Sequence, residues 1–135
     1  MKKEEARQHI EQNLEPGDSL VGFFQAIQPF KLWLFLFIGP LAVLSMKHYF
    51  VAVTRQGITF YRLSTMGKFA GQDSFAFGDI ESVKIGKGLL QRPMTFRFNN
   101  GRKLYVKATL KGVEKVAKID AETQSFIEDN VRTVT

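Results

Sequence analysis

The chain has 135 residues, of which 19 are Lys or Arg and 13 are Asp or Glu, so its formal net charge at pH 7 is +6. This length fits a single domain with its own hydrophobic core, and the absence of Cys excludes disulfides and thiolate metal sites. The N-terminal stretch MKKEEARQHIEQNLEPGD carries charges of both signs and no apolar h-region, so we expect no cleavable signal peptide and a cytoplasmic location.

The charges are distributed unevenly along the chain. From Ser19 to Gly112 there are 13 Lys and Arg but only three acidic residues, whereas the two flanks together carry 6 basic and 10 acidic residues. A basic middle favours an anionic partner such as lipid headgroups, nucleic acid or an acidic protein. Ordinary solubilising charge explains the same excess equally well.

The first predicted element is a short helix over residues 2–14. Ala6, Ile10 and Leu14 recur every four residues and form one apolar stripe. The sequence Glu-Pro-Gly-Asp at 15–18 ends the helix, because the residue before Pro disfavours helical backbone and Gly-Asp suits a turn. We therefore expect residues 1–18 to form a helix and turn that precede the main domain, 19–135.

Strand signals dominate the middle of the chain. Segments rich in β-branched and aromatic residues, or alternating in polarity, predict strands over 19–28, 49–54, 58–63, 73–77 and 80–85, with a glycine-bearing loop over 64–72. The stretch MTFRFNNGRKLYVK, residues 94–107, predicts a hairpin that turns at Asn-Asn-Gly.

The last predicted element is an amphipathic helix over residues 112–133. Val116, Ile119, Phe126 and Ile127 lie among the residues on its apolar side. About seven sequential antiparallel strands with one helix packed on them predict an α+β fold, in which the strands form a partly open antiparallel β-barrel.

The segment from Gly39 to Leu90 resembles the bacterial pleckstrin-homology-like (PH-like) domains. The matching pieces are FVAVT, ITFYR, DSFAFGDIESVK and KGLL, at residues 50–54, 58–62, 73–84 and 87–90. The resemblance implies a seven-stranded, partly open barrel that the C-terminal helix caps. It also implies a binding module for phosphoinositide headgroups, peptides or proteins, often assembled into homo-oligomers.

The resemblance further implies a ligand site in the loops after the first, third and sixth strands. For this chain the possible contacts with an anionic ligand are Lys31, Lys47, Lys68, Arg102 and Lys103. The Lys followed by Lys/Arg-x-Arg that phosphoinositide binders carry across the first hairpin is absent here.

Catalytic and metal-binding signals are weak. His9 and His48 fall in different elements, so no metal site is expected. No G-x-S-x-G elbow or phosphate-binding glycine loop occurs, so neither enzymatic activity nor a cofactor is expected. The hairpin places Arg97, Lys103 and Lys107 with the aromatic Tyr105 on one face, but a single aromatic favours a solvated basic face over nucleic-acid binding.

The uncharged run from Leu32 to Met46 allows three interpretations. Fifteen helical residues span only about 22 Å, against about 30 Å of hydrocarbon, and Gly39-Pro40 interrupts the run, so a membrane span ranks last. The second interpretation is a connection between strands that the protein's own core covers, but the five large apolar residues WLFLF would then have no polar face for water. The third interpretation is an exposed apolar surface that another molecule covers, since exposed apolar patches usually mark interfaces.

We therefore expect a non-enzymatic binding or scaffolding module that self-associates through the 32–46 segment, with the N-terminal helix contributing. The alternative is a peripheral module for anionic membranes that uses the basic loops and the same segment, because Trp beside Lys suits a bilayer interface. In both interpretations the contact residues are Trp33, Leu34, Phe35, Leu36 and Phe37.

Overall fold

The computed structural model describes residues 3–28, 47–64, 66, 68–88, 90–110 and 117–134. The elements of these residues confirm the α+β class. In chain order they are α1 (Lys3–Gln12), β1 (Leu20–Gln28), β2 (Lys47–Thr54), β3 (Gly57–Leu63), β4 (Phe69–Ala76), the 3-10 helix η2 (Phe77–Asp79), β5 (Ile80–Ile85), β6 (Gln91–Phe98), β7 (Lys103–Thr109), α3 (Ala121–Asn130) and β8 (Thr133–Val134).

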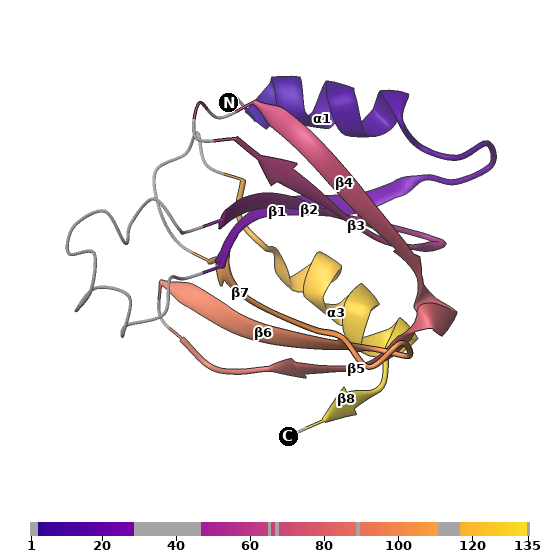
Figure 1. Cartoon of the computed structure of the whole chain (residues 1–135), viewed down its shortest axis with the longest axis vertical. Helices are drawn as coiled ribbons and strands as arrows, with labels where there is room; N and C mark the ends of the chain where they lie inside the picture. Colours follow the sequence, from indigo (N-terminus) through magenta and orange to yellow (C-terminus); the bar gives the residue numbers. More distant parts are fainter. Residues whose placement is uncertain are drawn as a thin grey trace.

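The strands form one open sheet with the order β4-β3-β2-β1-β7-β6-β5-β8. All neighbouring pairs are antiparallel except β5 and β8, which run parallel. The half made of β1–β4 faces the half made of β5–β7, and α3 lies between the two halves in Figure 1. The inner faces of both halves therefore enclose the same interior.

The main core fills this interior. On each strand every second side chain points inward, because successive side chains of a strand lie on opposite faces of the sheet. Phe60 of β3 makes edge-on contacts with Phe96 and Phe98 of β6, at centroid separations of 5.3 and 6.3 Å. These contacts join the two halves, and Ile127 of α3 is fully buried in the same cluster.

Helix α1 covers the opposite, outer face of β1–β4 (Figure 1). Ala6 and Ile10 are fully buried against Phe50 and Tyr61, in a second apolar cluster separate from the main core. His9 stacks on Phe69 with 3.8 Å between ring centroids. The apolar stripe of the predicted N-terminal helix is therefore covered by the chain's own sheet, which leaves only polar faces of α1 for a partner.

Helix α3 is shorter than predicted. It begins at Ala121, where the carboxylate of Asp120 accepts a hydrogen bond of 2.7 Å from the backbone N–H of Thr123. Residues 117–120 are extended because the sheet takes their backbone groups: Gln25 N–H donates to the Ala117 carbonyl, and Ile119 N–H donates to the Thr109 carbonyl. The part of the predicted helix at 112–116 lies outside the described residues.

Two further differences concern strands. Strand β4 begins at Phe69, inside the predicted glycine-bearing loop, because this segment pairs with β3 from Leu63 onward. The two-residue strand β8 was not predicted, since two residues are too short to produce a periodic signal. The strands predicted over 19–28, 49–54, 58–63 and 80–85 and the hairpin turn are confirmed within one or two residues at most ends. Among the described ranges, no helix has the length and apolarity needed to cross a bilayer.

The packing of α3 on β1 predicts a steric requirement at Gly22. A Cβ atom at this position would lie 2.1 Å from Thr123 Oγ1, so Gly22→Ala forces α3 away from the sheet. We expect a loss of about 1–3 kcal/mol in the free energy of unfolding, measured by urea denaturation. Gly78→Ala is the matched control, because nothing lies within 4 Å of its added Cβ. Equal stability of the two variants would contradict this packing.

The cover that α1 provides predicts a second effect. Ile10→Ala leaves a cavity between α1 and the sheet, and we expect it to lower the free energy of unfolding by about 2–5 kcal/mol. Gln8→Ala, at an exposed position of the same helix, should change it by less than about 0.5 kcal/mol. If α1 did not contribute to the folded unit, both variants would unfold at the same urea concentration as the parent chain.

Candidate functional site

A cavity of about 250 Å³ lies between the two halves of the sheet, and we call it the cationic cavity. None of its lining residues comes from α1 or α3. Strands β1–β4 and the β6–β7 hairpin supply the wall, which consists of Gln28, Lys47, Tyr49, Phe60, Arg62, Asp73, Phe75, Phe98, Arg102, Lys103 and Leu104.

Four cations and one carboxylate meet at this cavity. Lys47 begins β2, Arg62 lies near the end of β3, and Arg102 with Lys103 ends the hairpin turn. The single carboxylate is that of Asp73, so the lining has a net charge of +3. All five residues are exposed. Among the described residues the ion pair is Arg7–Glu11, so none of these five side chains is paired. The cations are therefore available to an anionic ligand.

Arg62 reaches the cavity because it lies on the inner face of β3, the face on which every second residue points toward the core. Ile58 and Phe60 point into the core, and Arg62 follows at the same spacing where the strand leaves the core. Its partner across β4 is Gly71, and a Cβ built there would lie 3.3 Å from Arg62 Nη2. The missing side chain at Gly71 leaves room for the guanidinium to lie across the strand.

The hairpin turn holds the second arginine. Gly101 adopts a φ of +87°, a backbone conformation that suits glycine in a tight turn. The Arg102 carbonyl accepts a hydrogen bond of 2.9 Å from Phe98 N–H, and Arg102 N–H donates one of 2.9 Å to Asn100 Oδ1. The backbone of Arg102 is thus fixed on both sides, which sets the position from which its side chain extends.

The floor of the cavity is apolar and carries one hydroxyl. Phe75 and Phe98 stack with 4.1 Å between centroids, and Phe60 contacts both. Tyr49 is 9% exposed; burial raises the pKa of its hydroxyl, an effect that Arg62 reduces and Asp73 reinforces. The hydroxyl is therefore protonated at neutral pH and can donate a hydrogen bond. An anionic group at the cavity would meet cations around its rim and this donor below.

The structure brings together three of the five cations expected from sequence. Lys47, Arg102 and Lys103 line the cationic cavity, whereas Lys68 is exposed in the β3–β4 connection and does not line it. Lys31 lies outside the described residues, as do Trp33, Leu34, Phe35, Leu36 and Phe37.

The sequence reasoning missed Arg62, Asp73, Tyr49 and Gln28. For Arg62 a signal existed, because side chains two residues apart on a strand share a face, and Arg62 follows the apolar Ile58 and Phe60 at this spacing. Asp73 carried no comparable signal: it is the first residue of the strand predicted over 73–77, and only its pairing opposite Phe60 places it on the inner face.

The connection that contains the apolar segment starts and ends at the cationic cavity. Gln28 and Lys47 are direct partners in the β1–β2 pairing, and both line the cavity. Residues 29–46 therefore leave the sheet and return to it at this one place.

A second hollow, of about 660 Å³, lies where β6 meets α3. Arg92 donates a hydrogen bond to Gln124, which in turn donates one of 3.0 Å to Glu128. This series of contacts ties β6 to α3, so we assign it a structural role. A third hollow lies on the outer face of the sheet.

The described part of the chain contains no set of side chains that could hold a metal ion. No group of three or more His, Cys, Asp or Glu side chains converges there. His9 packs on Phe69, and His48 lies on β2 between Ile27 and Leu63 of the neighbouring strands.

Comparison with protein-family models gives no match, and neither does comparison with curated proteins. Among solved structures, the chain is similar to the hSac2 domain from the human phosphoinositide phosphatase Sac2, with a TM-score of 0.53 and 12% sequence identity. The alignment covers 96% of this chain and 81% of that chain. At this identity the likeness shows the fold alone.

Proposed function

We propose that this protein is a PH-like, non-enzymatic binding module for anionic membrane surfaces, whose cationic cavity takes an anionic lipid headgroup. The observation that carries the proposal is the meeting of Lys47, Arg62, Arg102 and Lys103 at one cavity with only Asp73 opposing them. The location that follows is the cytoplasmic face of a membrane.

The form of the cavity supports a headgroup as the ligand. A phosphate group is recognised by Arg and Lys donors, and two arginines from different elements approach this cavity. The Tyr49 hydroxyl adds a neutral donor at the base. An extended surface without a cavity would attract anions only by long-range electrostatics, whereas this cavity also offers enclosure and an apolar floor.

The attachment of residues 29–46 beside the cavity supports a membrane as the source of that headgroup. The run WLFLF within this connection is uncharged and contains the chain's only Trp. Apolar and aromatic side chains next to a cluster of cations are the combination that membrane-surface proteins present to the interface. Headgroup and acyl region would then be contacted by adjacent parts of one site.

The strand order supports the PH-like assignment. Seven antiparallel strands in the order β4-β3-β2-β1-β7-β6-β5 precede the final helix, as the sequence resemblance implies, and β8 adds to the β5 edge. The likeness to the hSac2 domain supports this topology as a known fold.

Self-association through residues 32–46 is the second candidate function. The feature that favours it is again the uncharged aromatic run, because Trp and Phe are common anchors of protein interfaces. Helix α1 would contribute through polar residues, since its apolar stripe is buried on the sheet. The resulting homo-oligomer would serve as a scaffold.

The membrane proposal predicts that charge reversal at the cavity strongly weakens vesicle binding. Arg62→Glu should weaken binding to phosphatidylcholine vesicles that contain phosphatidylglycerol by roughly 2 kcal/mol, or about thirtyfold, measured by co-sedimentation at low salt. Arg55→Glu makes the same charge change in the turn at the far end of β2 and should have a much smaller effect. Equal losses for the two variants, or no sedimentation of the parent chain at low salt, would refute the proposed headgroup site.

Trp33 offers a test that separates the two candidates, because it is the only Trp in the chain. If the segment enters the interface, Trp33 fluorescence shifts to the blue on addition of anionic vesicles and is quenched by brominated lipid. If the segment joins subunits, the shift instead follows protein concentration in the absence of lipid. Trp33→Glu with Phe35→Glu should then reduce the mass in light scattering without unfolding the chain. A monomeric parent chain would exclude self-association.

A further inference from the structure

A polar groove of about 220 Å³ lies on the outer face of β2–β4, below the connection between α1 and β1. The turn at residues 15–18 closes it from above, with Gly17 at a φ of +84° and Asp18 N–H donating to the Glu15 carbonyl. The polar side chains of its lining include those of Glu15, Asp18, Thr59, Tyr61, Gln72 and Ser74.

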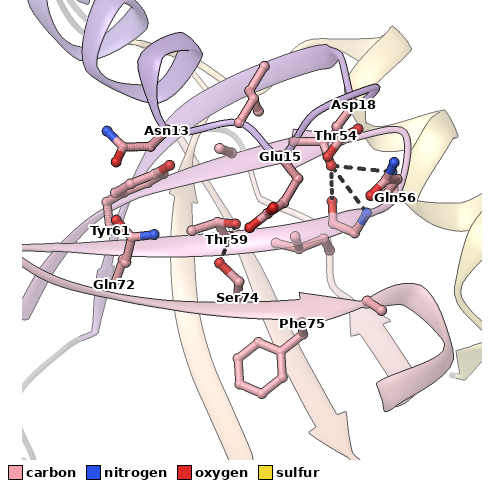
Figure 2. A pocket seen from close by; sticks show the side chains of 15 residues that line it. Asn13, Glu15, Asp18, Thr54, Gln56, Thr59, Tyr61, Gln72, Ser74 and Phe75 are labelled. Atoms are coloured by element: carbon pink, nitrogen blue, oxygen red, sulfur yellow. Dashed lines mark hydrogen bonds between the residues drawn. The ribbon is translucent and has the colours of Figure 1, made fainter.

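These polar ends converge on one space. Figure 2 shows Glu15 reaching from the connection toward Thr59, with Asn13 and Gln72 approaching from opposite sides beside Tyr61. The lining includes two carboxylates and no Lys, Arg or His. The groove is therefore locally acidic on a chain whose formal net charge is +6.

The Tyr61 hydroxyl reaches the groove. The ring of Tyr61 is buried, with 2% of the residue exposed, and the residue lines the groove, along which Figure 2 shows its hydroxyl directed. The neighbouring Thr59 and Ser74 hydroxyls bond each other at 2.9 Å. Burial raises the pKa of Tyr61, so its hydroxyl stays protonated at neutral pH and can both donate and accept.

The second observation is the strand edge that borders the groove. Strand β4 is the first strand of the sheet, so the backbone groups on its outer edge have no strand partner among the described residues. Natural sheets protect such edges with Pro, Lys, bulges, inward-pointing charges or a covering element. The β4 sequence FAGQDSFA contains neither Pro nor Lys, and most of its residues are exposed; its protective features are the inward Asp73 and the irregular register opposite Arg62 and Leu63, near its start.

The edge and the groove are related by the geometry of the sheet. A strand added to β4 would lie about 4.8 Å beyond it, and its side chains would alternate between the two faces. On the outer face these side chains would stand next to Gln72 and Ser74, which line the groove. A long side chain from the added strand would extend over β4 toward Glu15.

We propose that the β4 edge and the polar groove form a docking site for an extended, basic segment of a partner protein, which pairs with β4 and places a Lys or Arg side chain against Glu15 and the Tyr61 hydroxyl. The charges select this occupant. Two carboxylates without a cation favour a positive side chain, and the backbone edge favours an extended chain over a helix. Because the protein as a whole is basic, its general field repels such a segment and local contacts must hold it.

The test is a titration of the full chain with a capped heptapeptide of alternating threonine and lysine, followed by amide chemical shifts. We expect saturable binding, with the largest shifts in β4 and the α1–β1 connection and slower hydrogen exchange along β4. Glu15→Gln, which keeps the shape of the side chain, should weaken binding roughly tenfold, as loss of one charge-assisted hydrogen bond does. Tyr61→Phe should weaken it severalfold.

The controls separate the parts of the proposal. Glu11→Gln removes an exposed carboxylate of α1 that lies outside the groove and should leave the peptide affinity unchanged. A threonine–glutamate heptapeptide should not bind. Retained affinity in the Glu15→Gln variant, or equal binding of the two peptides, would overturn the proposed charge selection.

Two other outcomes would assign the site to a different occupant. If butylamine binds as tightly as the peptide and protects no β4 amides, the groove takes a small amine and strand addition is wrong. If light scattering shows a dimer that the peptide dissociates, the edge belongs to a second copy of this chain, and the proposal of a basic partner segment is overturned.

Discussion

The structure depends on the fact that β2 and β3 are covered on both faces. Phe60 and its inward neighbours build the interior shared with β6, while Phe50 and Tyr61 point outward and are covered by α1. A two-stranded or one-sided arrangement of the same strands would expose one of these apolar sets to water. Strands β2 and β3, with β4 paired beside them, form one wall between the two faces. Polar residues follow the apolar ones on either face of this wall. The cationic cavity and the polar groove both take most of their lining from it.

The cationic cavity is the part of the interior that the core does not fill. Aromatic side chains such as Phe60 and Phe98 fill the interior. Next to them, the inner faces of β3 and β4 carry Arg62 and Asp73, which line the cavity. An arginine at the end of an inward row is costly unless it reaches water or an anion. Here it reaches the opening, and the glycine opposite makes room for it. The same rule that builds the core, side chains alternating along each strand, therefore delivers charged groups where the core ends.

Sequence reasoning succeeded where a period was long enough to read. The helix at the N-terminus, most of the strands and the hairpin at 94–107 follow from local periodicity and from Asn-Asn-Gly, and the structure confirms them. It failed where long-range partners decide the backbone. Residues 117–120 were predicted to be helical, but backbone hydrogen bonds to β1 and β7 hold them in an extended conformation. The start of β4 was predicted to be a loop, but it pairs with β3. For the site, three cations were predictable from their loops, whereas Arg62 and Asp73 become neighbours only through the β3–β4 register.

Consecutive residues of β3 and β4 serve opposite sides of the wall: Tyr61 and Gln72 border the acidic groove, and Arg62 and Asp73 border the basic cavity. This arrangement constrains how such a chain can diverge. Substitutions at these four residues can change the charge or polarity of either side by itself, because each of the four lines only one of the two hollows. An insertion or deletion of a single residue within these strands would instead carry the arginine outward and the tyrosine inward at once, exchanging the electrical character of the two faces while burying a charge. Length changes are therefore tolerated better in the connecting turns than within this wall.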